Sequence, residues 1–329
     1  MSKISAGENS DRRGPCITVL MPVFNGGSHL AQQVESILRQ DVVDLSLMAI
    51  DDGSSDESHR LLMEMARRDS RIIVSRHDSN RGLIQTIGEL LAEVRSPYFA
   101  LADQDDIWDR SKLSTSIEFL CTENVKLVYS DVRVIDSTGI VTVERYLRKN
   151  GIKSIEGSNP LPFVFRNPAI GHTIVSTVDV AHLAKDIPDG LVFHEAWLVA
   201  AACALGQVRF IDAALGSYRV HSSNVVGPKS GGLRRRTKTI ANLRRLEMRQ
   251  RIRTVGLKAV ASLHPEFTGI ADAYSTDGPR RVLLAPRVVI VLLRQAREIG
   301  LMPIMIEIGA FLLHGLRHRK ANMSSNTEG

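Results

Sequence analysis

The chain has 329 residues, of which 43% are hydrophobic and 24% are charged, and its formal net charge is +6. This ordinary composition can bury one substantial core and a small second domain. Three cysteines, Cys16, Cys121 and Cys203, lie far apart without CxxC spacing, which excludes a disulfide framework and a zinc ribbon and predicts a reducing compartment.

The first sixteen residues are polar, contain glycine and serine, and include no apolar stretch. They predict a disordered leader and not a signal peptide. We therefore expect the chain to stay on the cytoplasmic side of the membrane.

Short apolar runs alternate with helical patterns from Ile17 to about Asp131, which predicts a β/α layered domain with a mostly parallel central sheet. Ile17 to Val23 is the first strand, and the spacing of the apolar residues from Leu30 to Leu38 predicts a helix after it. The later strands are expected at 45–50, 72–75, 98–102 and 126–130, with helices at 57–68 and around 83–91.

A less regular segment at 136–168 leads to a second informative block at 193–227, which includes a helical run from 197 to 205. Residues 228–232 have the composition of a hinge. The sequence thus predicts three parts. They are a leader at 1–16, a catalytic domain at 17–228 and a basic helical tail at 229–329.

Positive charge is concentrated in the tail, where Glu247 is the only acid between residues 234 and 253. Such a run is compatible with a solvated helix face, a nucleic-acid patch or a surface for anionic lipid. The apolar stretches that follow, 288–293 and 299–313, are too short and too interrupted to span a bilayer. They predict either core helices, packed on the catalytic domain or on a second subunit, or helices that lie on a membrane surface. The nine basic residues are Arg234, Arg235, Arg236, Lys238, Arg244, Arg245, Arg249, Arg251 and Arg253.

The most informative segment is Asp103-Gln104-Asp105-Asp106, which follows the apolar run at 98–102. Three carboxylates within four positions repel one another, and a divalent metal is the simplest compensation. Strand alternation would bring Asp103 and Asp105 to one side of a sheet edge as hard oxygen ligands. The alternative is an acidic loop that caps a helix starting near Ser111.

Two further polar clusters fall at predicted strand ends, at residues 21–25 and at residues 51–56. Ligands of open α/β sheets collect beyond the carboxyl ends of the strands. The second cluster also has a purely structural interpretation, because Asp and Ser residues form turns and Ser55 or Asp56 could cap the next helix.

Together, Met21-Pro22-Val23-Phe24-Asn25, Asp51 to Asp56 and the Asp103 motif resemble the family 2 glycosyltransferases of the GT-A fold, which use nucleotide-diphosphate sugars. The resemblance covers about residues 17–227. It implies that Asp51 reads a pyrimidine imide through a charge-assisted hydrogen bond. The other donor-binding candidates in these two clusters are Pro22, Phe24, Asn25 and Asp52.

The resemblance also implies a metal site and a catalytic base. Asp103 and Asp105 match the family's metal-binding acids, with Asp105 as the direct metal ligand and Asp103 facing either the donor ribose or the same ion. Asp106 would be a supporting partner, and Mg²⁺ or Mn²⁺ would bridge the diphosphate oxygens. Glu195, in Phe193-His194-Glu195-Ala196-Trp197, takes the place of the carboxylate that deprotonates the acceptor. Its alternative role is that of a first-turn acid favoured by the helix dipole.

Three further segments resemble family motifs. In Tyr218-Arg219-Val220-His221, Arg219 would face the diphosphate and His221 would be a third metal ligand. Asn80-Arg81-Gly82-Leu83 resembles an Asn-x-Gly-Leu turn and makes Arg81 a donor-binding candidate, although Gln85-Thr86-Ile87 departs from the family's Ala-Arg-Asn. Gly171-His172-Thr173 resembles an acceptor-side Gly-Cys-Thr, and the resemblance assigns no role to His172.

We therefore expect an inverting, metal-dependent hexosyltransferase that uses a glycan or lipid-linked acceptor in bacterial cell-surface polysaccharide synthesis. The motif Asp-Gln-Asp-Asp-Ile-Trp, followed later by Tyr-Arg-x-His, most resembles the rhamnosyltransferases. The first candidate donor is therefore dTDP-rhamnose, which would supply rhamnose. The expected location is the bacterial cytoplasm, peripheral on the inner face of the cytoplasmic membrane, with a homo-oligomer as an open alternative.

Two rival functions remain open at this point. A sugar-phosphate nucleotidylyltransferase has a similar layered fold, but residues 22–27 lack the basic residue that its phosphate loop needs. A nucleic-acid-binding protein could use the arginine-rich run, but this run has no aromatic residues for base stacking. We therefore expect no nucleic-acid partner.

Overall fold

The computed structural model describes residues 16–42, 44–221, 238–276, 279–301 and 303–312. Within these ranges, the side chains of residues 238–247, 249 and 279–282 are also left out. The predicted leader up to residue 15, the hinge at 228–232 and Arg234 to Arg236 therefore lie outside the described residues.

One half of the sheet is parallel and consists of β1 (Ile17–Val23), β2 (Leu45–Asp51), β3 (Ile72–Arg76) and β4 (Tyr98–Leu101), in the order β3-β2-β1-β4. Six of the seven β1 residues are buried. Such continuous apolar strands are typical of parallel sheets that are covered on both faces. The predicted bounds of these four strands agree with the structure to within one residue.

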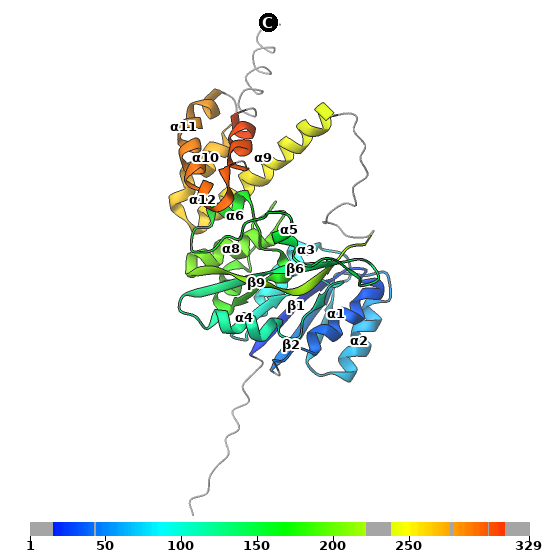
Figure 1. The fold of residues 1–329 in the computed structure, drawn as a ribbon. Coiled ribbons are helices and arrows are strands. Elements are labelled where there is room, and N and C mark those ends of the chain that lie inside the picture. The colour runs from blue at the N-terminus through cyan, green and yellow to red at the C-terminus, as the bar shows by residue number, and fades with distance from the viewer. Residues whose placement is uncertain (1–15, 43, 222–237, 277–278, 302, 313–329) are drawn as a thin grey trace, which may run out of the picture.

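The other half of the sheet is mixed. β8 (Val175–Thr177) is antiparallel to both β4 and β6 (Val125–Ile135), whereas β9 (Gln207–Arg219) runs parallel to β6. β5 (Ile107–Trp108) and β7 (Val141–Val143) add antiparallel edges, so the described residues form a nine-stranded sheet (Figure 1). The mostly parallel pattern holds for the first half only. β8 follows the irregular middle segment, and an antiparallel strand needs no helical crossover.

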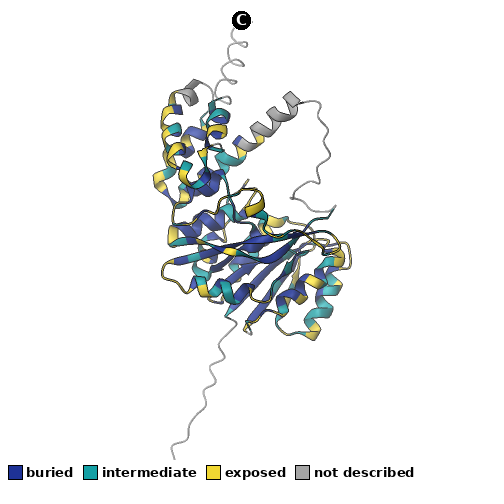
Figure 2. Ribbon diagram, viewed as in Figure 1, coloured by how far each residue is buried: buried dark blue, intermediate teal, exposed yellow. Residues whose placement is uncertain are grey.

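Helices cover both faces of the sheet and enclose two apolar cores. One layer contains α1 (Leu30–Leu38), α2 (Ser58–Arg68) and α4 (Lys112–Leu120), and the other contains α3 (Leu83–Ala92), α7 (Val178–Ala184) and α8 (His194–Leu205). Side chains alternate between the faces, so Val19 and Met21 join the first core and Leu20 joins the second. Figure 2 shows the strands buried between these layers.

Shorter elements connect these layers. They are the 3₁₀ turns η1 (Gly27–His29) and η2 (Gly171–Thr173) and the helices α5 (Tyr146–Lys149) and α6 (Leu161–Phe165). All five residues of α6 are buried. They lie where the helices that cover the sheet meet the C-terminal helices.

The C-terminal region is helical, as predicted, and packs on α6 and α8 (Figure 1). Leu257, Tyr274 and Leu292 belong to the same apolar cluster as Trp197 of α8. None of the helices in the described part of the chain is long and apolar enough to cross a membrane. The elements are α9 (Lys238–Leu263), η3 (Pro265–Phe267), α10 (Thr268–Ser275), α11 (Pro279–Arg294), α12 (Ala296–Ile299) and a helical segment at 303–312.

Gly206, which ends α8, is expected to tolerate no side chain. A Cβ atom there would lie 2.4 Å from the backbone oxygen of Asn124. Gly206→Ala should therefore destabilise the fold by about 1–3 kcal/mol, as overpacking does, and lower the melting temperature by about 2–4 °C per kcal/mol. Gly269→Ala in α10 is the matched control, because no atom lies within 4 Å of its Cβ position. Thermal unfolding followed by circular dichroism measures both, and wild-type melting of Gly206→Ala would contradict the packing.

Candidate functional site

A cleft of about 2030 Å³ opens beyond the carboxyl ends of β1, β2 and β4. Its walls come from the loops after these strands, the 3₁₀ turn η2, the segment before α8 and the end of β9. Asp51 and Arg219 are absent from the lining. The other predicted site residues that line it are Pro22, Phe24, Asn25, Asp52, Arg81, Asp103, Asp105, Glu195 and His221.

The loop after β1 is held by the acidic turn after β2. Asn25 has a left-handed backbone (φ 50°), and its side-chain oxygen accepts a hydrogen bond from the backbone N–H of Ser55 at 2.9 Å. Polar side chains of the turn thus shape this wall of the cleft. The N-cap residue of α2 is Glu57, and not Ser55 or Asp56 as the structural interpretation predicted. The backbone N–H groups of residues 25, 26 and 27 donate to Ser54 Oγ, Ser58 Oγ and Asp56 Oδ2, respectively.

Gln104 links the acidic motif to the same loop. Its Oε1 accepts from the backbone N–H of Phe24 at 2.9 Å, and its Nε2 donates to the backbone oxygen of Phe24 at 3.1 Å. A Cβ atom on Gly26 would meet Oε1 at 3.0 Å, so a glycine suits this close approach. The sequence analysis assigned no role to Gln104 and missed this one.

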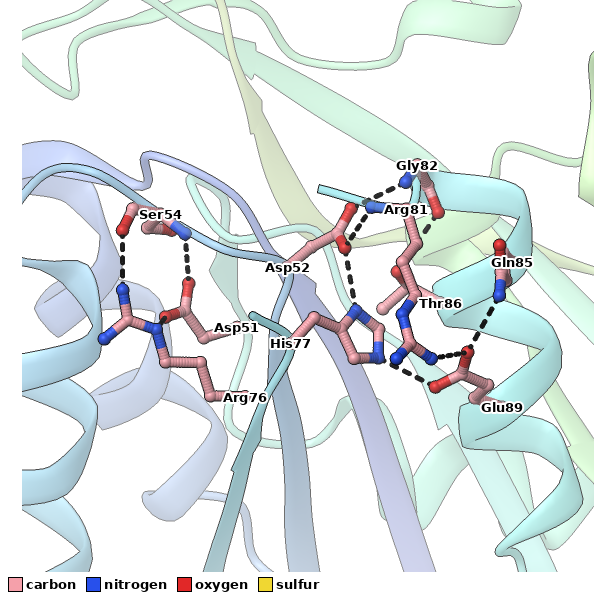
Figure 3. Close-up of polar contacts among 10 residues, drawn as sticks. All are labelled: Asp51, Asp52, Ser54, Arg76, His77, Arg81, Gly82, Gln85, Thr86 and Glu89. Atoms are coloured by element: carbon pink, nitrogen blue, oxygen red, sulfur yellow. Dashed lines mark hydrogen bonds and ion pairs between the residues drawn. The ribbon is translucent and has the colours of Figure 1, made fainter. Parts of the chain in front are cut away.

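Asp51 and Asp52 point to different partners although they are adjacent (Figure 3). Asp51 is fully buried, accepts from the backbone N–H of Ser54 at 3.1 Å and lies 3.2 Å from Arg76 Nε. Asp52 lines the cleft, and its two oxygens accept from the backbone N–H groups of Arg81 and Gly82, each at 2.8 Å. Asp52 therefore fixes the turn that carries Arg81.

Asp103, Asp106 and His172 form a compact group whose ligand atoms all lie within 4.8 Å of one another. Nδ1 of His172 is 3.1 Å from Asp103 Oδ2 and 3.0 Å from Asp106 Oδ2. Asp103 is 46% exposed, whereas His172 and Asp106 are buried beneath it. His172, which had no role in the sequence analysis, thus orients Asp103 from inside the protein.

Buried charge surrounds this group. Burial is the largest cause that raises the pKa of Asp106 to about 7, and the charges of Asp103 and Asp105 add to it. Burial lowers the pKa of Lys112 to about 7. Lys112 donates to the backbone oxygen of His172 at 2.7 Å and lies over the Trp108 ring. The carboxylates of Asp103 and Asp106 therefore need a nearby cation or a bound proton to compensate their charge in this buried position.

Asp105 and His221 face each other at the cleft, with Asp105 Oδ2 2.8 Å from His221 Nε2. The His221 ring also contacts His29, with ring centroids 5.3 Å apart. Each of the Asp105 and His221 side chains is 16% exposed. The two residues thus offer an oxygen and a nitrogen ligand at the edge of the cleft.

Arg219, the last residue of β9, is buried against the acidic motif. Its backbone N–H donates to Asp106 Oδ1 at 3.0 Å, and its Nε donates to the backbone oxygen of Asp105 at 2.9 Å. Its Nη2 donates to Gln32 Oε1 at 2.7 Å. In this structure Arg219 supports the acidic motif from behind, and the expected contact with a diphosphate stays a prediction.

Glu195 lies in the first turn of α8 and lines the cleft. Its Oε2 is buried and has no hydrogen-bond partner among the described residues. Trp197 anchors this turn, because its Nε1 donates to the backbone oxygen of Ala184 at 2.9 Å. A Cβ atom on Gly171 would meet His194 Nε2 at 3.0 Å, so Gly171 leaves room for the histidine beside Glu195.

The fold is that of the GT-A glycosyltransferases. Staphylococcus aureus TarS residues 1–349, solved with UDP-GlcNAc, gives a TM-score of 0.53 at 15% identity and covers 77% of this chain and 71% of that one. The mannosyltransferase PcManGT from Pyrobaculum calidifontis, solved with GDP-Man and Mn²⁺, gives 0.53 at 15% identity and covers 94% and 89%. The predicted fold class is thereby confirmed.

Comparison with protein sequences narrows the result of the structural comparison. Residues 18–175, just under half of the chain, match the family model described as Glycosyl transferase family 2. Escherichia coli WfgD, named as a UDP-Glc:alpha-D-GlcNAc-diphosphoundecaprenol beta-1,3-glucosyltransferase, is 26% identical over 38% of this chain and 49% of its own length. Bacillus subtilis TuaG, named as a putative teichuronic acid biosynthesis glycosyltransferase, is 25% identical over 38% and 50%. The chain thus spans about half the length of these relatives.

Proposed function

We propose that the protein is an inverting glycosyltransferase that moves a sugar from a nucleotide-diphosphate donor to a hydroxyl group of a glycan or lipid-linked acceptor in cell-surface polysaccharide synthesis. One observation carries this proposal. The carboxylates of Asp103 and Asp105 and the side chain of Glu195, whose Oε2 lies 3.7 Å from His194 Nδ1, belong to one cleft of about 2030 Å³. The family 2 match at residues 18–175 supports the same reaction class.

The donor would bind along the wall formed by the loops after β1, β2 and β3. Phe24 is 44% exposed and offers a flat apolar surface to a base. Arg81 is 47% exposed at the same cleft and offers a cation to the nucleotide. Rhamnose on dTDP stays our first candidate from the sequence motifs. The similar proteins include WfgD, named for UDP-Glc, and the structures of TarS with UDP-GlcNAc and of PcManGT with GDP-Man.

A divalent ion fits the acidic end of the cleft, because carboxylate and imidazole ligands suit Mn²⁺ and the carboxylates also suit Mg²⁺. Asp103, Asp105 and His221 line the cleft and would hold the ion. His172 and Asp106 are buried and would orient Asp103 from beneath. The bound ion would stabilise the negative charge that develops on the departing nucleoside diphosphate.

Glu195 would act as the single general base. Its carboxylate accepts the proton of the acceptor hydroxyl while the acceptor oxygen bonds to the anomeric carbon and the bond to the diphosphate breaks. The nucleoside diphosphate leaves with the bonding electrons. The buried position of Oε2 excludes water from one side of the carboxylate, which favours proton transfer from a bound acceptor.

The C-terminal helices would hold the cleft near a lipid-linked acceptor. On α11, Leu283, Arg287, Ile290 and Arg294 are all exposed and recur at helical spacing, so they share one face. Apolar residues beside arginines and without acids suit an anionic membrane surface. Exposed apolar side chains continue after this helix at Leu301, Met305 and Ile306.

Glu195→Gln should lower the rate of sugar transfer by about a hundred- to ten-thousand-fold, because that is the usual contribution of a general base. Donor binding measured by calorimetry should stay within about twofold of wild type, since the amide keeps the shape of the side chain. Glu118→Gln on the exposed face of α4 is the matched control. A variant that retains more than about a third of wild-type turnover excludes Glu195 as the base.

Removal of metal should abolish transfer, and added Mn²⁺ or Mg²⁺ should restore it. The donor is first chosen by thermal shift among UDP-glucose, dTDP-rhamnose and GDP-mannose. Asp105→Asn should then raise the metal concentration needed for half-maximal rate by at least about tenfold. Asp109→Asn is the control, because Asp109 pairs with Arg133. Normal turnover of a chelator-stripped enzyme with no residual metal would contradict the metal role.

The 329-residue chain should sediment with anionic liposomes at low salt and be released at high salt, because each cation contributes roughly 1 kcal/mol near such a surface. Ile290→Glu should weaken binding by about tenfold, since it places a carboxylate on the membrane face of α11. Ile140→Glu is the control, because Ile140 is also exposed but lies in the loop between β6 and β7. The opposite result has two parts: the wild-type protein binds no liposomes at any salt concentration, and Ile290→Glu converts a dimer to a monomer in analytical ultracentrifugation. In that case this surface is a subunit interface.

A further inference from the structure

His77 lies directly after β3, behind the turn that carries Arg81 (Figure 3). Its side chain is 8% exposed. Nδ1 lies 2.8 Å from Asp52 Oδ1, and Nε2 lies 2.7 Å from Glu89 Oε2. Both ring nitrogens therefore face carboxylate oxygens from different elements, because Asp52 follows β2 and Glu89 belongs to α3.

This geometry restricts the protonation state of His77. A neutral imidazole carries only one N–H, so its second nitrogen would present a lone pair to a carboxylate oxygen at hydrogen-bond distance. Both contacts are attractive only when the ring is an imidazolium or when one carboxyl group holds a proton. A chain of charge-assisted hydrogen bonds from Asp52 through His77 to Glu89 satisfies every partner.

The neighbouring charges favour the imidazolium. Asp52, Glu89 and Arg81 are the charged groups that act on His77, and Arg81 Nη1 also donates to Glu89 Oε1 at 3.1 Å. Burial acts to lower the pKa of His77, but the hydrogen bonds to Asp52 and Glu89 outweigh it and raise the pKa above its ordinary value. With the ring charged, two carboxylates balance two cations.

We propose that His77 is a positioning residue of the donor site, and that its imidazolium form holds Asp52 and Glu89 so that Arg81 is fixed at the cleft. This inference rests on the proposed function, because it concerns the affinity for a nucleoside diphosphate. Asp52 Oδ1 is shared by His77 and the backbone N–H of Arg81, and Glu89 anchors the Arg81 guanidinium. When His77 loses its proton, one of its two contacts with a carboxylate becomes repulsive. Asp52 and Glu89 are then held less firmly, and so is Arg81, which both of them contact.

The sign of the pH dependence follows from the charged form. Donor affinity should be full below the raised pKa of His77 and should fall as the pH rises through it, above the ordinary value of about 6.5. We expect the dissociation constant of UDP to increase by about three- to tenfold, which is the scale of one charge-assisted hydrogen bond. Calorimetric titration of the 329-residue chain with UDP and Mn²⁺ between about pH 6 and pH 9 measures this.

Glu89→Gln is the decisive variant. The Gln side chain can donate its N–H to a neutral His77 and still accept from Arg81 through its carbonyl oxygen. The imidazolium is then no longer required, so the ratio of the wild-type to the Glu89→Gln dissociation constant should rise with pH. Ionisation of the UDP phosphate and of the metal ligands is common to both proteins and cancels in this ratio.

Matched controls distinguish a role of His77 in positioning Arg81 from a role in stabilising the fold. Glu93→Gln changes the same residue type one turn further along, outside the network, and should keep the wild-type pH profile. His77→Asn should bind UDP more weakly at pH 6, with little pH dependence. Thermal melts at each pH verify folding, and if His77→Asn does not fold, the Glu89→Gln comparison still decides.

The outcomes distinguish the two proposals. If the wild-type protein binds none of UDP, dTDP and GDP at any pH, the proposed function fails. If the wild-type protein binds UDP, or whichever of the three it prefers, and its ratio to Glu89→Gln is flat across the pH range, the role of His77 is wrong. A rising ratio with an unchanged Glu93→Gln profile supports the positioning role.

Discussion

The architecture of the cleft depends on the compensation of carboxylates that the topology gathers at one edge of the sheet. Asp103, Asp105 and Asp106 follow β4, whereas Asp51 ends β2 and Asp52 follows it, two strands away in the same sheet. Each acid is balanced by a cation or by N–H groups from a distant segment. Because like charges are costly to bury together without such partners, these contacts hold the loops in a defined arrangement at the cleft.

Much of the fold was predictable because the strands of the parallel half are covered on both faces. Their sequences are therefore continuous apolar runs, and residues 17–23 and 45–51 stand out from the helical patterns between them. The position of the polar clusters at strand ends follows from the same topology. The antiparallel insertion of β8 was not predictable, since three residues carry no signal of their direction or partner.

The sequence did not allow us to predict which residues contact one another within the site. His172 lies 69 residues from Asp103, and Gln104 lies 80 residues from Phe24, so no local pattern connects them. The two aspartates after β2 illustrate a second limit. Adjacent side chains at the end of a strand point to opposite sides, and the sequence does not tell whether Asp51 or Asp52 faces the cleft. In the structure Asp52 does.

The C-terminal helices show why a boundary based on composition can divide a structural unit. The charge of the tail differs sharply from that of the preceding domain, yet Leu257, Val260 and Tyr274 share one apolar cluster with Trp197. Trp197 in turn anchors the turn of α8 that carries Glu195. Removing the tail would expose this core and disturb the candidate base. The function of the tail should therefore be tested by substitutions on its exposed face and not by truncation.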